Sequence, residues 1–175
     1  MLTLILGGAR SGKSGYAQRL ATASGLPVGY VATAEAGDAE MAERIARHQA
    51  ERPAHWLTRE APLRPDLAFD AADCIVLDCL TLWLSNWLCR DDGAGFAEAR
   101  AALLTQARAV AGDPARRLIL VANEVGLGVI PMGELSRRFV DEAGWLNQEL
   151  AVIADEVVFM AAGLPLFMKG KSSND

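Results

Sequence analysis

Hydrophobic residues in this chain fall into short continuous runs, which alternate with longer segments where they recur every three or four positions. The short runs have the length and composition of buried strands. They predict strands over 2–6, 28–32, 74–78, 117–122, 156–161 and 164–168. The periodic segments predict helices over 14–23, 38–51 and 80–88, from 96 to about 111, and from about 133 to 154. The chain therefore alternates strand and helix from its start.

The first predicted strand runs directly into a glycine-rich motif, Gly7-Gly-Ala-Arg-Ser-Gly-Lys-Ser14. Its spacing is that of a phosphate-binding P-loop, and it lies between a strand and a helix as such a loop requires. Gly7 and Gly12 allow a tight turn whose N–H groups face phosphate oxygens, next to the positive end of the helix. Lys13 can reach the β and γ phosphates, and the Ser14 hydroxyl can bind Mg²⁺. A glycine turn without a ligand is the alternative.

The order of elements predicts the fold class. Continuous apolar strands separated by helices favour a mostly parallel sheet covered on both faces, which is a three-layer α/β fold of the P-loop NTPase type. Ligands then bind at the carboxyl ends of the strands. We expect a single domain over residues 1–169 and a polar, disordered tail over 170–175. Residues 54–72 have no clear pattern, and Pro62 and Pro65 are expected to break any long element there.

Composition narrows the possible partners. A chain of 175 residues with 51% hydrophobic content can bury a sizeable core, and its net charge of −5 without a basic block argues against nucleic acid. The three cysteines (Cys74, Cys79 and Cys89) lack metal-site spacing and are expected to be buried free thiols. The chain opens on a strand and has no apolar run of membrane-spanning length, so we expect no signal peptide and a cytoplasmic location.

Asp78 is the first candidate outside the P-loop. It ends an apolar strand, which is where a P-loop enzyme places the carboxylate that holds Mg²⁺. Capping of the next helix is the alternative for an aspartate at this position. The P-loop upstream favours the metal interpretation.

A charged helix carries the second candidate cluster. Arg44, His48 and Arg52 follow one another at intervals of four, which predicts that they share one face. Two guanidinium groups beside an imidazole can form a phosphate clamp around a nucleophile, because the positive charges favour the neutral ring. Glutamates lie in the same helix, so a solvated charged surface is the alternative. His55 is expected to be structural.

Two other segments have open interpretations. The loop 123–131, after the fourth strand, contains two glycines and a proline, and Asn123 and Glu124 could face the site or simply begin a connection. Trp83 and Trp87 lie four apart on one helix, which is more typical of a core or a subunit interface than of a ligand platform.

These motifs together resemble one family, the bifunctional adenosylcobinamide kinase/adenosylcobinamide-phosphate guanylyltransferases of cobalamin biosynthesis. The resemblance rests on the P-loop, on Asp78-Cys-Leu-Thr81, and on segments 30–34, 44–53, 123–131 and 139–157. It implies phosphorylation of adenosylcobinamide with ATP or GTP, and then transfer of GMP from GTP to adenosylcobinamide phosphate through a GMP–histidine intermediate. It also implies Mg²⁺ and a homotrimer.

The resemblance also assigns residues. His48 occupies the position of the nucleophile. The implied nucleotide site comprises Gly7, Gly8, Ala9, Arg10, Ser11, Gly12, Lys13, Ser14, Thr33, Ala34, Gln49, Arg52, Glu60 and Asp78. Two alternatives remain: a P-loop small-molecule kinase without guanylyltransferase activity, and a non-catalytic nucleotide-sensing module.

Overall fold

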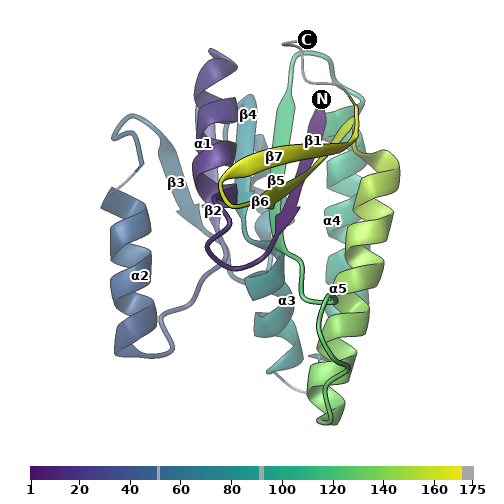
Figure 1. The fold of residues 1–175 in the computed structure, drawn as a ribbon. Coiled ribbons are helices and arrows are strands. Elements are labelled where there is room, and N and C mark those ends of the chain that lie inside the picture. The colour runs from purple at the N-terminus through teal and green to yellow at the C-terminus, as the bar shows by residue number, and fades with distance from the viewer. Residues whose placement is uncertain (51, 91–92, 171–175) are drawn as a thin grey trace.

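The computed structural model describes residues 1–50, 52–90 and 93–170, with only the backbone of Arg44. Its described part forms one seven-stranded sheet in the order β3-β2-β4-β5-β1-β6-β7 (Figure 1). All neighbouring strands are parallel except β6 and β7, which form an antiparallel hairpin. The strands are β1 Leu2–Gly7, β2 Val28–Ala32, β3 Leu57–Glu60, β4 Cys74–Asp78, β5 Arg117–Asn123, β6 Glu156–Ala161 and β7 Leu164–Lys169.

Helices cover both faces of this sheet. The larger core cluster packs α3, α4 and α5 on one face, and the smaller cluster packs α1 on the other. Figure 1 shows α2 to one side of this layered body. The helices are α1 Lys13–Ala23, α2 Ala39–Ala50, α3 Leu80–Leu88, α4 Phe96–Ala111 and α5 Glu134–Ile153, with a 3₁₀ helix η1 at Pro65–Ala71. The predicted three-layer α/β fold is confirmed.

Strand order determines where the candidate site lies. The P-loop follows β1 and Asp78 ends β4, while β5 pairs with both strands and lies between them. Neighbouring strands are about 4.8 Å apart, so the carboxyl ends of β1 and β4 are separated by roughly 10 Å. Both motifs therefore meet the same edge of the sheet with room for a ligand between them.

One stretch of the prediction is wrong. Residues 54–72 were expected to be irregular, but they contain β3 and η1. All four residues of β3 are exposed, because it is an edge strand that adds to β2 by backbone pairing without an apolar face. Pro65 begins η1 instead of breaking it, since a proline at the first helical position leaves no hydrogen bond unmade.

Asp38 caps α2 as expected, since its Oδ1 accepts a hydrogen bond of 2.7 Å from the backbone N–H of Met41. That helix ends at Ala50, and Arg52 lies beyond it, so Arg52 is not on the helix face that carries His48. The expected disordered tail stays a prediction, because residues 171–175 lie outside the described ranges.

Candidate functional site

The P-loop has the backbone conformation that its glycines were predicted to allow. Gly12 adopts a φ of 94° just before α1. Gly7 has a φ of 150°, and a Cβ atom there would lie 2.5 Å from the carbonyl oxygen of Met160. The residues at the crest of the loop are exposed, so its backbone faces solvent at the sheet edge. A phosphate group can reach this backbone without displacing any side chain of the core.

Lys13 is buried at the base of this loop. Its Nζ donates hydrogen bonds to the carbonyl oxygen of Gly8 at 2.7 Å and to the Ser11 hydroxyl at 3.4 Å. Burial lowers the pKa of Lys13, although Cys79 and Asp78 oppose this effect. The ammonium group therefore lies within the loop that it would serve, and a bound phosphate would give it a stronger partner than a carbonyl oxygen.

Two segments distant in sequence hold the loop in place. The backbone N–H of Gly163, in the β6–β7 turn, donates to the carbonyl oxygen of Ser11 at 3.0 Å. The backbone N–H of Glu124 donates to the carbonyl oxygen of Gly7, also at 3.0 Å. The Glu124 carboxylate accepts a hydrogen bond from Gly126 within its own loop. The loop after β5 thus acts as a support for the P-loop in this structure.

Asp78 has a specific partner at the end of β4. Its Oδ2 accepts a hydrogen bond of 2.6 Å from the hydroxyl of Tyr30, which lies on β2. Burial, followed by the charge of Asp78, raises the pKa of Tyr30, so the phenol keeps its proton and acts as the donor. The residue at the N-cap of α3 is Cys79, and its helix has no side-chain cap. Asp78 therefore does not cap the helix, which removes that alternative.

Thr33 is buried beside Asp78 and makes several hydrogen bonds. Its hydroxyl donates to the carbonyl oxygen of Cys79 at 2.7 Å and accepts from the N–H of Cys79 at 2.9 Å. Its own carbonyl oxygen accepts from Asn86 Nδ2 at 2.7 Å. Thr33 therefore links the end of β2 to the end of β4 and to α3. Ala34 follows it and is half-buried.

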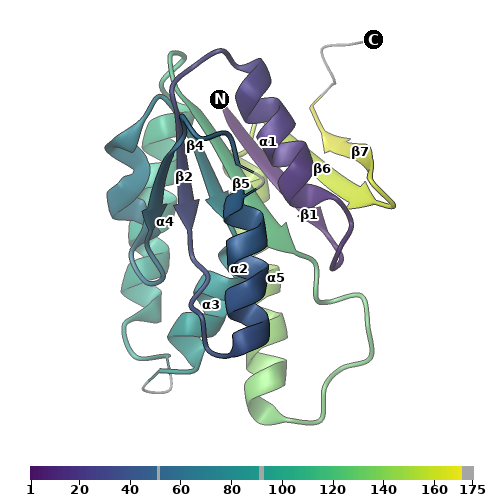
Figure 2. The same cartoon turned by 90° about the vertical axis from the view of Figure 1, so that its left-hand side faces the viewer.

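The helix that carries His48, α2, lies to one side of the P-loop (Figures 1 and 2). Among the α2 residues whose side chains are described, Met41 and Ile45 are half-buried and the others, including His48, are exposed. Both views show α2 to the side of the loop between β1 and α1 (Figures 1 and 2). The side chain of Arg44 lies outside the described part of the chain, so the expected clamp around His48 stays a prediction.

The segment after α2 does reach the site. The guanidinium carbon of Arg52 lies 3.7 Å from the centroid of the Tyr30 ring, in a cation–π contact. Its Nε and Nη1 atoms are buried and have no hydrogen-bond partner among the described residues. Gln49 Nε2 contacts Glu60 Oε1 at 3.5 Å, and Glu60 pairs in register with Ala32. Arg52, Gln49 and Glu60 therefore cluster at the β2–β3 side of the sheet edge.

The site offers oxygen ligands that suit Mg²⁺. Ser14 lies in the first turn of α1, next to the P-loop. Asp78 uses Oδ2 to accept the bond from Tyr30, and its Oδ1 has no hydrogen-bond partner among the described residues. Mg²⁺ is commonly held by one or two protein oxygens together with substrate phosphates and water. Within the described ranges, no three His, Cys, Asp or Glu side chains form a metal-binding cluster.

The tryptophans of α3 and the three cysteines lie outside the P-loop and can each be compared with the prediction. The indole N–H groups of Trp83 and Trp87 both donate to the carbonyl oxygen of Leu63, at 2.9 and 3.1 Å. Trp83 lies in the core and Trp87 packs against it, which agrees with the favoured prediction of a core position. Cys74 and Cys79 are buried free thiols, but the expectation for Cys89 is wrong, because it lies exposed at the C-terminal end of α3. Of the helices in the described ranges, none has the length and apolarity to span a bilayer.

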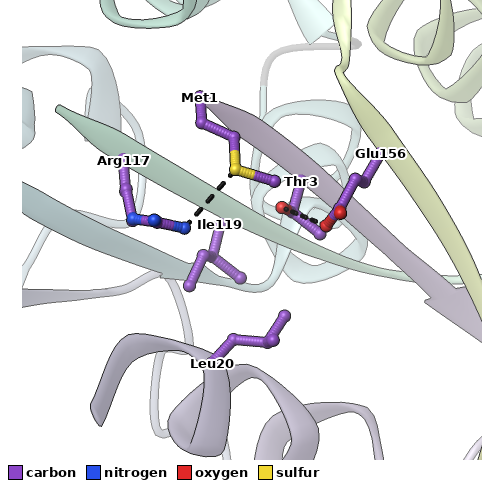
Figure 3. A pocket seen from close by; sticks show the side chains of 6 residues that line it. All are labelled: Met1, Thr3, Leu20, Arg117, Ile119 and Glu156. Carbon is purple, nitrogen blue, oxygen red and sulfur yellow. Dashed lines mark hydrogen bonds between the residues drawn. The ribbon is translucent and has the colours of Figure 1, made fainter. Parts of the chain in front are cut away.

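A small cavity lies far from the P-loop, at the amino ends of the strands (Figure 3). Its volume is about 30 Å³, and Thr3 donates to Glu156 at 3.4 Å across one side of it. This is room for about one water molecule. It is lined by Met1, Thr3, Leu20, Arg117, Ile119 and Glu156. The P-loop lies instead at the opposite, carboxyl ends of the strands.

Tyr30 and Asn86 have contacts near the site that the hydrophobic pattern did not predict. Tyr30 appeared as one apolar position of a strand, although a buried tyrosine hydroxyl normally finds a hydrogen-bond partner. Asn86 interrupts an apolar helix, which is a signal for a buried polar contact. Neither signal identifies the partner, because that depends on which strands are neighbours.

Comparisons with solved structures agree with this fold. A RadB recombinase structure superposes with a TM-score of 0.54 at 16% identity, over 90% of this chain and 73% of that chain. An ATPase from a bacterial type III secretion system superposes with a TM-score of 0.57 at 12% identity, over 98% of this chain and 59% of that chain. At these identities the similarity concerns the fold alone.

Sequence comparisons are more specific. The bifunctional adenosylcobalamin biosynthesis protein CobP of Pseudomonas aeruginosa is 54% identical over 175 residues, covering 98% of this chain and 99% of that protein. The corresponding CobU protein of Salmonella typhimurium is 38% identical, covering 97% of this chain and all of that protein. The profile described as "Cobinamide kinase / cobinamide phosphate guanyltransferase" matches residues 3–168. The chain therefore belongs to the cobinamide kinase/cobinamide phosphate guanyltransferase family.

Proposed function

We propose that this chain carries out both reactions of its family with one nucleotide site at the carboxyl edge of the sheet. The observation that carries the proposal is the P-loop with its buried Lys13, at the same edge as Asp78, in a chain matched by the family over residues 3–168. The substrates are ATP or GTP and adenosylcobinamide, followed by GTP and adenosylcobinamide phosphate.

In the kinase reaction, the hydroxyl oxygen of the aminopropanol arm attacks the γ-phosphorus. A new P–O bond forms, the bond to the β-phosphate oxygen breaks, and the nucleoside diphosphate leaves as the hydroxyl proton is released. The P-loop N–H groups and Lys13 hold the phosphates in line and stabilise the developing charge. Ser14 and Asp78 would hold Mg²⁺, which would supply positive charge against the charge that develops on the leaving group. Gly7 to Ser14 form the phosphate cradle in this scheme.

In the guanylyl transfer, a ring nitrogen of His48 attacks the α-phosphorus of GTP. The N–P bond forms and the α–β bridging bond breaks, so pyrophosphate leaves and GMP remains on the histidine. A phosphate oxygen of adenosylcobinamide phosphate then attacks the same phosphorus and the N–P bond breaks. Arg44 would bind phosphate oxygens beside His48, and Arg52 would bind them from its position next to Tyr30. Thr33, Ala34, Gln49 and Glu60 would line the nucleoside side of the site.

This scheme requires α2 to approach the P-loop, because His48 is exposed on α2, and Figure 1 shows that this helix lies to one side of the P-loop. The sparse packing of α2 supports such a rearrangement, since few apolar contacts would be lost. Arg52 already contacts Tyr30 at the edge of the site. This contact would keep the C-terminal end of α2 near the site while the rest of the helix moves.

Labelling tests the assignment of His48. The protein is incubated with Mg²⁺ and GTP labelled at the α-phosphate, and then denatured. We expect acid-labile label on the wild type and on His55→Ala, which alters the other histidine of the chain, and none on His48→Ala. His48→Ala should retain phosphorylation of adenosylcobinamide.

Each alternative predicts a different result. A small-molecule kinase without guanylyltransferase activity would transfer γ-phosphate but leave no label on the denatured chain. A nucleotide-sensing module would show neither reaction. Label that survives His48→Ala would contradict the role of His48 while leaving the transferase activity in place.

The quaternary structure and location belong to the same proposal. We expect a homotrimer, supported by large apolar side chains that are exposed in one chain, including Val129, Met132, Val152 and Leu166. A cytoplasmic location is supported by the free state of all three cysteines.

A further inference from the structure

Tyr30 occupies a constrained position on the α1 face of the sheet. Its side chain is only 2% exposed, and its Cα pairs in register with Val76 on β4. Asp78 lies two residues further along β4 and therefore on the same face. The Tyr30 hydroxyl reaches across this step to Asp78 Oδ2 at 2.6 Å, a short bond from a neutral donor to a charged acceptor.

The ring that carries this hydroxyl is held by two neighbours. The indole of Trp56 stacks on it with a centroid separation of 6.5 Å and an interplanar angle of 27°. The guanidinium of Arg52 lies over the ring at 3.7 Å. Trp56 is itself buried, so the phenol has little freedom to turn. The hydroxyl is thus a fixed donor at the end of β4.

A carboxylate with one oxygen held in this way has a defined orientation. Without the Tyr30 hydroxyl, the carboxylate of Asp78 could rotate about its terminal bond, because that torsion has broad minima. With Oδ2 held, Oδ1 carries no recorded hydrogen bond among the described residues and remains available to a cation or a water molecule. Side chains that orient a metal ligand in this way typically change metal affinity or activity 10- to 100-fold.

We propose that Tyr30 is a positioning residue of the nucleotide site, which orients Asp78 so that its Oδ1 faces the divalent cation bound with the nucleotide. The inference rests on the proposed role of Asp78 in metal binding. Tyr30 itself contacts neither the nucleotide nor the reacting atoms. A purely structural tyrosine would affect the stability of the fold and leave cation binding unchanged.

The test uses the full chain and Mn²⁺ as the probe, in the presence of α,β-methylene GTP, which cannot be cleaved between its first two phosphates. Electron paramagnetic resonance gives the Mn²⁺ dissociation constant for each variant, and analogue binding in EDTA gives the affinity without metal. The variants are Tyr30→Phe, which keeps the ring between Arg52 and Trp56, and Asp78→Asn. Tyr16→Phe is the matched control, because Tyr16 is the other tyrosine and its hydroxyl has no recorded hydrogen bond among the described residues.

We expect Tyr30→Phe to raise the Mn²⁺ dissociation constant by about 10- to 100-fold. Analogue affinity in EDTA should stay near that of Tyr16→Phe, while the urea unfolding midpoint should fall because the hydrogen bond to Asp78 is lost. Equal Mn²⁺ affinity in Tyr30→Phe and Tyr16→Phe, together with weaker binding in Asp78→Asn, would overturn the role of Tyr30 alone. A lower unfolding midpoint with unchanged Mn²⁺ affinity would do the same. Unchanged Mn²⁺ binding in Asp78→Asn would instead contradict the proposed metal site itself.

Discussion

At the scale of single residues, the site is built from polar groups that the core would otherwise exclude. Lys13 is 7% exposed and Thr33 is fully buried, yet each makes at least two hydrogen bonds at the sheet edge. Buried polar groups are costly unless they are paired, and the bonds of Thr33 to Cys79 form only when β2 and β4 are neighbours. The chemistry of the site therefore depends on the register of the strands.

Replacement of Lys13 tests whether both reactions share the P-loop. Lys13→Ala should lower kcat/KM for the kinase and guanylyltransferase reactions by roughly 100- to 1,000-fold each, because a preorganised positive donor to phosphate is lost. Lys169→Ala is the control, since Lys169 bonds to carbonyl oxygens at the end of α5. Steady-state kinetics of both reactions give the result. Full kinase activity in Lys13→Ala would contradict a shared site.

The three cysteines are expected to differ in their reactivity, because two are buried and one is exposed. Burial raises the pKa of Cys74, and raises the pKa of Cys79 from 9.0 to about 12. An aromatic disulfide reagent should therefore modify one thiol quickly in the native protein, Cys89, and three after denaturation. Cys89→Ser should remove the fast reaction. Fast modification of two or three thiols in the native protein would contradict the buried positions.

The same shifts affect stability. Above pH 9 the unfolded chain releases thiol protons that the folded chain still holds at Cys74 and Cys79. The folded state then binds more protons, so the contribution of these thiols to the free energy of unfolding falls as the pH rises through this range. Urea unfolding of the wild type and of Cys74→Ala, compared between pH 8 and pH 10, measures the share of Cys74. A steeper fall in the variant would contradict this sign.

At the scale of elements, α3 organises the loops around the site. Asn86 Nδ2 donates to the carbonyl oxygens of Thr33 and Pro62, at 2.7 and 3.0 Å. Arg90, just after the helix, forms an ion pair with Glu35 at 2.7 Å. The helix thus holds the segment that leads from β2 toward α2, and it does so mainly through backbone carbonyl groups.

Asn86→Ala tests this organisation. Loss of its side chain leaves two carbonyl oxygens without their donor, so the free energy of unfolding should fall by about 1–2 kcal/mol. Ser85→Ala is the matched control on the same helix, since among the described residues the Ser85 hydroxyl makes only a long contact of 3.9 Å, to Cys89 Sγ. Its effect should stay within about 0.5 kcal/mol. Chemical denaturation followed by tryptophan fluorescence provides both values. Equal effects of the two substitutions would contradict the role of Asn86.

Some helices and strands of this fold could be predicted from the sequence and others could not. The strand, P-loop and helix over residues 2–23 were predictable because the motif is local and its glycines have a defined backbone purpose. The edge strand β3 was not, since four exposed residues carry no periodic signal. The bond from Tyr30 to Asp78 spans 48 positions and depends on the pairing of β2 with β4. The position of α2 beside the body was equally inaccessible, because helix spacing does not encode where a helix packs.

At the scale of the whole molecule, exposed apolar surface suggests an assembly. Side chains of Leu127, Val129, Ile130 and Met132, after β5, are 78% to 96% exposed, and Leu164, Leu166 and Met168 along β7 are 63% to 71% exposed. Patches of this kind commonly mark interaction sites. Light scattering after size-exclusion chromatography should give three times the chain mass of 18.7 kDa. A mass of one chain across micromolar concentrations would contradict the trimer.

The hydrogen bond from Gly163 to the P-loop also has a consequence for synthesis of the protein. The loop is encoded near the beginning of the chain, but its strand pairs with β5 and β6, and its Ser11 carbonyl is bound by a turn more than 150 residues later. Contacts over such separations form only when both segments have left the ribosome. A nascent chain that stops before β6 should therefore lack a supported phosphate loop, so nucleotide capture would coincide with the end of translation.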